Sequence, residues 1–151
     1  MKLKLSEIPE DGLTLSESFN PAAMSLETPD LKFTAPLVVS ATFHKARDTV
    51  VVAVEAAGRM TLTCARCLAA YPEPYQGQFD LGYEVKGKVA LDVTDDIRQE
   101  ILLSYPVQFL CKESCQGLCS RCGKNMNEGN CSCPPESVGI RKGVFDATTQ
   151  T

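Results

Sequence analysis

Cysteines crowd the C-terminal third of this 151-residue chain, where six of the eight lie between positions 111 and 133. The other two form the pattern C-A-R-C near the middle of the chain. Where thiols stay reduced, such a pattern indicates metal ligands or redox groups rather than disulfides. The fold is therefore expected to be organised around eight thiols: Cys64, Cys67, Cys111, Cys115, Cys119, Cys122, Cys131 and Cys133.

The compartment matters for this interpretation of the cysteines. The opening sequence MKLKLSEIPE has no apolar run of the kind that a signal peptide carries. No other stretch approaches the ~20 apolar residues that a membrane span needs. We therefore expect a cytoplasmic protein without a membrane partner, in which the thiols stay reduced.

The last four cysteines have the spacing of a closed zinc site. Cys119 and Cys122 form C-x-x-C, followed by Gly123, and a tight turn of this form brings two sulfurs to one metal. Cys131 and Cys133 are two positions apart, so both side chains project to the same face of an extended segment. Together the four cysteines predict a tetrahedral four-thiolate zinc site.

The remaining four cysteines leave alternatives open. Cys64, Cys67, Cys111 and Cys115 could hold a second zinc ion if the middle of the chain packs against its end. Alternatively, the protein holds one metal, and several thiols are buried or free. Four cysteines also hold iron–sulfur clusters, and zinc thiolates can release their metal when oxidised.

The sequence before the cysteine-rich segment predicts mostly strands. Alternating or β-branched runs at 1–5, 13–15, 31–42, 49–57, 60–63 and 71–85 favour an antiparallel sheet, with a turn expected at Gly58 and Arg59. A brief helix is expected over 21–27. The main helix is expected near 94–105, where Thr94 supplies a cap and two aspartates follow it.

This order of elements predicts an α+β fold, mainly an antiparallel sheet with one main helix and a C-terminal cysteine-rich zinc-binding segment. We expect a β-rich domain with the helix over residues 1–110. The cysteine-rich metal-binding segment, 111–133, should pack on this domain. The remaining residues, 134–151, show little apolar periodicity and are expected to form a flexible tail.

Other polar residues carry less information. His44, the single histidine, is expected on a strand surface rather than at a metal. Arg66, Arg121 and Lys124 lie beside ligand candidates, where they would neutralise a negative zinc centre or contact a partner or RNA. The sequence contains no phosphate-binding glycine loop, nucleophile–base pair or hydrolase motif, so we expect no enzyme activity. A net charge of -4 argues against a general nucleic-acid coat.

Four segments of this chain resemble the YceD family, the large ribosomal RNA subunit accumulation proteins, long catalogued as a domain of unknown function. They are the opening KLSEIPEDGL, the central LTCARCL, the acidic-then-apolar segment 95–106 and the cysteine-rich segment 111–133. The last is similar to the family pattern C-x-x-x-C-K-G-L-C-P-x-C-G-x-N-L-N…C-x-C. Gln116, Ser120 and Met126 depart from the family's usual Lys, Pro and Leu, and no cysteine is lost.

The resemblance implies a cytoplasmic, non-enzymatic factor for accumulation or processing of large-subunit (23S) ribosomal RNA during ribosome biogenesis. Its partner would be ribosomal RNA or a basic ribosomal protein, contacted directly or indirectly, with no small-molecule substrate. The acidic net charge suits a basic protein at least as well as RNA. The cysteine density alone predicts an alternative, a thiol-redox sensor or zinc-released chaperone.

Overall fold

The computed structural model describes residues 1–134, and its main body is a five-stranded antiparallel sheet. β5 is the central strand: β6 pairs along one edge, and β4 and β3 share the other edge one after the other. β2 pairs with the far edge of β4. The strands of this sheet are β2 (Leu13–Phe19), β3 (Leu31–Phe33), β4 (Leu37–Ala46), β5 (Thr49–Thr63) and β6 (Ala70–Glu84).

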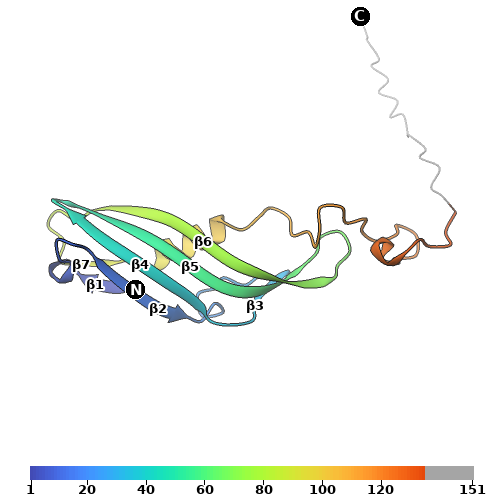
Figure 1. The fold of residues 1–151 in the computed structure, drawn as a ribbon, viewed down its shortest axis with the longest axis horizontal. Coiled ribbons are helices and arrows are strands. Elements are labelled where there is room, and N and C mark those ends of the chain that lie inside the picture. Colours follow the sequence, from blue (N-terminus) through green and yellow to red (C-terminus); the bar gives the residue numbers. More distant parts are fainter. Residues whose placement is uncertain (135–151) are drawn as a thin grey trace, which may run out of the picture.

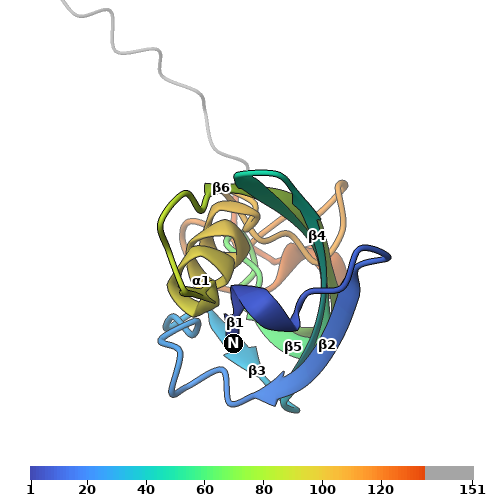
Figure 2. The same cartoon turned by 90° about the vertical axis from the view of Figure 1, so that its left-hand side faces the viewer.

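Two short strands and an α-helix cover one face of this sheet, and a further short turn lies in the cysteine-rich segment. The two strands form a separate antiparallel pair, and the α-helix follows them. The sheet is long and curved, and the helix lies inside the curve (Figures 1 and 2). The cysteine-rich segment extends beyond one end of the sheet (Figure 1). These elements are β1 (Lys2–Lys4), β7 (Ala90–Asp92), α1 (Thr94–Leu103) and two 3-10 turns, Leu5–Glu7 and Met126–Glu128.

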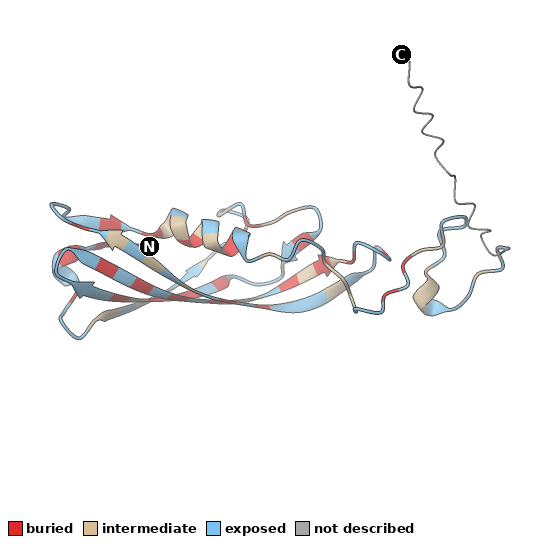
Figure 3. Cartoon of the chain, turned by 90° about the horizontal axis from the view of Figure 1, so that it is seen from above, coloured by how far each residue is buried: buried red, intermediate tan, exposed pale blue. Residues whose placement is uncertain are grey.

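Alternation of apolar and polar residues builds the core between sheet and helix. Odd-numbered residues of β4 and even-numbered residues of β5 are buried in alternation (Figure 3). They share one core with Ile97 and Ile101 of α1. Burying such a side chain stabilises the fold by about 1.5–3 kcal/mol. The inward residues of the two strands are Leu37, Val39, Ala41, Phe43, Val50, Val52, Val54, Ala56, Met60 and Leu62.

The turn expected at Gly58 and Arg59 is wrong, because β5 continues through both residues to Thr63. The inward alternation runs unbroken along the strand, and Gly58 occupies one of its inward positions. A Cβ atom there would come within 3.1 Å of Cδ1 of Leu37. The glycine therefore makes room for a neighbouring side chain rather than for a turn.

Two other expectations are also corrected. The brief helix expected over 21–27 is a series of turns, in which the side chain of Asn20 accepts a hydrogen bond from the amide of Ala22 at 3.1 Å. An Asx turn of this kind competes with helix formation, and Ser25 is left-handed, with a φ of 52°. The strand expected over 31–42 is divided into β3 and β4 just before and after Pro36, which has no amide hydrogen to donate.

The α-helix confirms the expected main helix, with small differences at its ends. Thr94 is its first residue rather than its cap, and the carboxylate of Asp92 accepts hydrogen bonds from the Thr94 amide and hydroxyl at 3.1 and 2.7 Å. These hydrogen bonds hold the pKa of Asp92 below its usual range. Tyr83 donates a 2.6 Å hydrogen bond to Asp96 and so ties the helix to β6.

The coarse architecture predicted from the sequence is confirmed: a mainly antiparallel sheet, one main helix and a cysteine cluster near the C-terminus. The tail expected over 134–151 lies outside the described residues, apart from Pro134. Within residues 1–134, no helix combines the length and hydropathy that crossing a membrane requires.

Candidate metal centres

The tip of the β5–β6 hairpin presents the C-A-R-C motif. β5 ends at Thr63, and the chain turns so that the Leu68 amide donates to the Cys64 carbonyl at 2.9 Å. The Cys64 amide donates to Ala69 at 3.0 Å, which closes the loop. This turn places Cys64 and Cys67 next to the segment that follows α1. The same segment accepts a hydrogen bond from the amide of Ala65.

Four cysteines meet at this hairpin tip, and we name the group site one: Cys64, Cys67, Cys111 and Cys115. Their sulfur atoms all lie within 4.8 Å of one another, and the Cys64–Cys115 and Cys67–Cys111 pairs are each 3.7 Å apart. A tetrahedral zinc ion with sulfurs at 2.3 Å requires sulfur–sulfur separations of about 3.8 Å. The donor set and its spacing therefore fit a four-thiolate zinc ion.

The last four cysteines form a second group, which we name site two: Cys119, Cys122, Cys131 and Cys133. Their sulfurs also lie within 4.8 Å of one another, with Cys119 and Cys131 at 3.4 Å. Gly123 has a φ of 71° and donates to the Cys119 carbonyl at 2.9 Å, which closes the C-x-x-C turn. The predicted ligands of this site are thus brought together, as are those of site one.

Burial distinguishes the two sites. In site one, Cys64, Cys67 and Cys115 are buried, and they pack against Tyr71 and other apolar neighbours. In site two, Cys122 is exposed and its three partners are half-buried. A metal in site one would be shielded from solvent, whereas a metal in site two would be open to chelators and oxidants.

Within each site, one thiol has a lowered pKa and another has a raised pKa. Burial raises the pKa of Cys64, but hydrogen bonds from three backbone amides bring it down to about 6. Burial raises the pKa of Cys111 to about 12. In site two, two backbone amides lower the pKa of Cys119 to about 6, whereas a hydrogen bond with the Cys122 thiol raises that of Cys133 to about 12. Crowded thiols cannot all ionise unless a cation compensates their charge, so both sites suit a divalent metal.

Asn127 connects the two sites. It lies in the loop between the C-x-x-C and C-x-C pairs of site two, yet its side-chain amide donates a 3.3 Å hydrogen bond to the Cys115 sulfur of site one. The side-chain carbonyl oxygen of Asn127 accepts a hydrogen bond from the backbone amide of Gln116 at 3.0 Å. The hydrogen bond to sulfur is the largest cause that lowers the pKa of Cys115. Sequence reasoning missed this residue, because a donor to a thiolate has no spacing rule of its own.

Replacing Asn127 by alanine is expected to weaken metal binding at site one about 10–100-fold, because outer hydrogen bonds orient metal ligands and hold them in the binding form. Competition titration with a chromophoric chelator measures this affinity. Asn130→Ala is the control, since Asn130 is exposed in the same loop, and within the described part of the chain only its backbone carbonyl is hydrogen bonded, to Lys124. Equal affinities for the two variants would contradict the assignment.

Gly117 supports the contact between the two segments of site one. Its φ is 76°, and a Cβ atom there would lie 3.1 Å from the backbone oxygen of Arg66. Gly117→Ala should therefore lower stability by about 1–3 kcal/mol through left-handed strain plus this close approach. Gly87→Ala is the matched control, because Gly87 has a φ of 75° and open space around it. The difference between the two in chemical denaturation reports the contact, and similar losses would refute it.

The predicted basic and histidine residues occupy different positions. The Arg66 guanidinium donates to the Cys115 and Glu113 carbonyls at 3.0 and 3.5 Å, and Lys124 donates to the Asn130 carbonyl at 3.0 Å. Both therefore brace the loops that carry the cysteines. Arg121 is exposed. His44 lies exposed on β4, as expected for a strand-surface residue, and belongs to neither cysteine group.

Comparison with known proteins matches the C-terminal part of the chain. Residues 83–146 match the family described as "Large ribosomal RNA subunit accumulation protein YceD". A maize protein described as the chloroplastic YCED homolog 1 is 39% identical over 59 residues, which cover 36% of this chain and 20% of that protein. The Arabidopsis thaliana protein of the same description is 33% identical over 46 residues, or 30% of this chain and 14% of that protein.

The matched region contains α1 and both cysteine pairs of site two, but only half of site one. The chain spans only a small part of the length of the curated relatives that it matches. No solved structure matches it. The family model and both relatives agree, and the resemblance to the YceD family that the sequence predicted is confirmed over residues 83–146.

Proposed function

We propose that this protein is a non-enzymatic, zinc-stabilised binding module that acts in the accumulation or processing of large-subunit (23S) ribosomal RNA. The description of the family and of both relatives supports the ribosomal role. The observation that carries the proposal is the presence of two groups of four cysteines, each with its sulfur atoms within 4.8 Å of one another. Four protein ligands leave no open coordination position, which is the pattern of structural rather than catalytic zinc.

The proposed role of the metals is to hold a binding surface together. Site one would join the β-rich body, 1–110, to the cysteine-rich segment, 111–133, and site two would fold that segment itself. Arg66, Arg121 and Lys124 would help to offset the negative charge of the thiolates. An iron–sulfur cluster would use the same ligands. A colourless protein with stoichiometric zinc after anaerobic purification would support zinc, and a brown protein would contradict it.

We propose that the protein works in the cytoplasm with ribosomal RNA or a basic ribosomal protein. A net charge of -4 supports the basic protein as the direct partner, because phosphates would be repelled by an acidic surface. The RNA would then be affected through an assembled or protected ribosomal particle.

The ratio of large- to small-subunit ribosomal RNA in cells that lack the protein tests the proposed function. We expect a selective fall in the large RNA, which the wild-type gene restores and a Cys119→Ser, Cys122→Ser double variant does not. Ser120→Ala is the control, because Ser120 lies exposed between these cysteines and is not a ligand candidate. An unchanged ratio in the deletion strain would refute the ribosomal role.

A thiol-redox sensor is the second candidate, favoured by the exposure of Cys122 in site two. Two thiolates of that site would give a disulfide, peroxide would be reduced to water, and zinc would be released. A sensor should lose one zinc equivalent under mild peroxide and change its circular dichroism, whereas a structural site should retain its metal. Retention of both equivalents would remove this candidate.

A further inference from the structure

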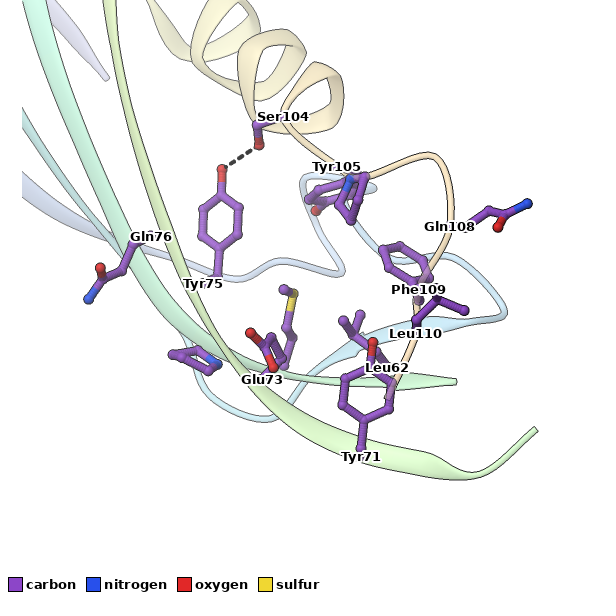
Figure 4. A pocket seen from close by; sticks show the side chains of 13 residues that line it. Leu62, Tyr71, Glu73, Tyr75, Gln76, Ser104, Tyr105, Gln108, Phe109 and Leu110 are labelled. Carbon is purple, nitrogen blue, oxygen red and sulfur yellow. Dashed lines mark hydrogen bonds between the residues drawn. The ribbon is translucent and has the colours of Figure 1, made fainter. Parts of the chain in front are cut away.

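A pocket of about 390 Å³ lies beside site one, between β6 and the chain that follows α1. Tyr71 and Glu73 enter it from β6, and Tyr105 and Phe109 enter it from the opposite segment (Figure 4). Aromatic and aliphatic side chains supply most of its walls. Apolar walls with polar groups at defined positions are the general pattern of a ligand-binding pocket, and Glu73, Gln76, Ser104 and Gln108 supply the polar groups here.

The charge that lines this pocket is negative. Among residues 1–134, Glu73 is the single charged residue that lines it, and no lysine or arginine of that range contributes to its walls. No salt bridge of Glu73 is found in the part of the chain that the structure describes. Tyr71 and Leu110 line the pocket and also pack against the buried cysteines of site one. A four-thiolate zinc centre there would carry two negative charges, of which the guanidinium of Arg66 would offset one, so its net contribution to the potential stays negative.

Two of the aromatic walls are held in place. The Tyr75 hydroxyl is hydrogen bonded to the Ser104 hydroxyl at 3.0 Å (Figure 4), and the Tyr105 hydroxyl donates to the Leu26 carbonyl at 3.0 Å. The two rings meet edge to face, with centroids 6.2 Å apart. Fixed rings cost little entropy when a ligand binds, so this part of the pocket is preorganised.

Aromatic rings beside an unpaired carboxylate are the chemistry that recognises a guanidinium group. Arginine is attracted to ring faces, and its planar fork donates two parallel hydrogen bonds to a carboxylate. A nucleic acid could stack a base on the same rings, but its phosphates would face Glu73 and the thiolates of site one. The charge therefore favours a protein partner over RNA.

We propose that this pocket binds an arginine side chain presented by a basic protein segment, with Glu73 as the charged contact and the aromatic residues as its walls. This inference rests on the proposed function and deepens it, because it assigns a basic protein as the direct partner. A buried arginine in an aromatic pocket is a common energetic centre of a protein interface.

Binding of a synthetic peptide by the full-length, zinc-loaded protein tests the pocket. The probe is a fluorescein-labelled Gly/Ser peptide with two arginines, and its twin carries citrulline, which is neutral and nearly the same shape. We expect the arginine peptide to bind and the citrulline peptide not to bind. Glu73→Gln should weaken that binding about tenfold or more, as the loss of a charge-assisted contact worth ~1.4 kcal/mol or more implies.

Glu84→Gln is the matched control, because it removes the same charge from an exposed position on the same strand. The control should leave affinity within about twofold, since an isolated exposed charge contributes little. Equal losses in both variants, or equal binding of the citrulline twin, would overturn the pocket assignment. The arginine peptide could also fail to bind while a single-stranded uridine 12-mer binds more tightly to Glu73→Gln than to the wild-type protein. That result would assign the surface to RNA and overturn the pocket assignment as well.

The cellular ribosomal RNA ratio separates this inference from the proposed function. If the ratio falls without the protein but Glu73→Gln restores it as fully as wild type and the peptide does not bind, the pocket inference fails alone. If loss of the protein leaves the ratio unchanged, the proposed function fails whatever the pocket binds. A Glu73→Gln variant that folds, retains both zinc ions and fails to restore the ratio supports both.

Discussion

Replacing Cys64 by serine is expected to remove one of two bound metal equivalents and to destabilise the whole β-rich body. Cys64 is fully buried, and its sulfur lies 3.7 Å from that of Cys115, which is 51 positions away in the sequence. Zinc binding at such sites is worth ~10–16 kcal/mol and is coupled to folding, so losing one ligand should lower stability by several kcal/mol. Metal analysis and thermal unfolding measure the two effects on the same sample.

Two comparisons isolate the metal in this experiment. Cys122→Ser should also lose one equivalent, but with a smaller fall in the melting temperature, because site two lies in an exposed segment beyond the sheet. In excess chelator, wild type and Cys64→Ser should unfold at similar temperatures, since the substitution itself changes little volume. A Cys64→Ser protein that keeps both equivalents, or a stability gap that persists without metal, would show that site one is not a metal site.

Replacing Ile101 by alanine is expected to lower the free energy of unfolding by about 2–5 kcal/mol. Ile101 has no exposed surface and packs between α1 and the inner face of the sheet. The substitution leaves a cavity that the curved sheet cannot close, because hydrogen bonds of Tyr83 with Asp96 and of Tyr75 with Ser104 tie both ends of the helix to β6. Chemical denaturation followed by circular dichroism measures the loss.

Leu103→Ala provides the internal standard for that measurement. Leu103 lies on the same helix, but 77% of its side chain is exposed. Its replacement should change stability by less than about 0.5 kcal/mol, as is usual for exposed positions. If the two variants were equally stable, the face of α1 that meets the sheet would be assigned wrongly.

Local sequence patterns predicted the features of this protein that depend on neighbours in the chain. The valine-rich alternation of β5 and the aspartates before Ile97 predicted a strand and a helix, and both are present. The spacing of the cysteines predicted the group of Cys119, Cys122, Cys131 and Cys133 and left the second group open, and the structure brings both groups together. Short-range spacing is informative here because one turn determines which two sulfurs face the same way.

Features that depend on distant neighbours could not be predicted from the sequence. Gly58 looked like a turn, because only the packed position of Leu37 shows why a side chain is excluded there. β7 is three residues long and has too little alternation to be detected before its partner is known. Asn127 and the pocket near Glu73 arise from contacts between segments that folding alone brings together.

The pairing of β1 with β7 sets the order in which this chain can assemble during its own synthesis. The amino group of Met1 is hydrogen bonded to Thr94, 93 positions away, whereas β4, β5 and β6 pair through short connections. At about 5–20 residues per second, β1 waits roughly 5–20 s before its partner β7 exists. The long hairpins can form in that interval, because closing short loops costs less entropy. β1 is made before the strands of the main sheet and is thus among the last elements to find its place.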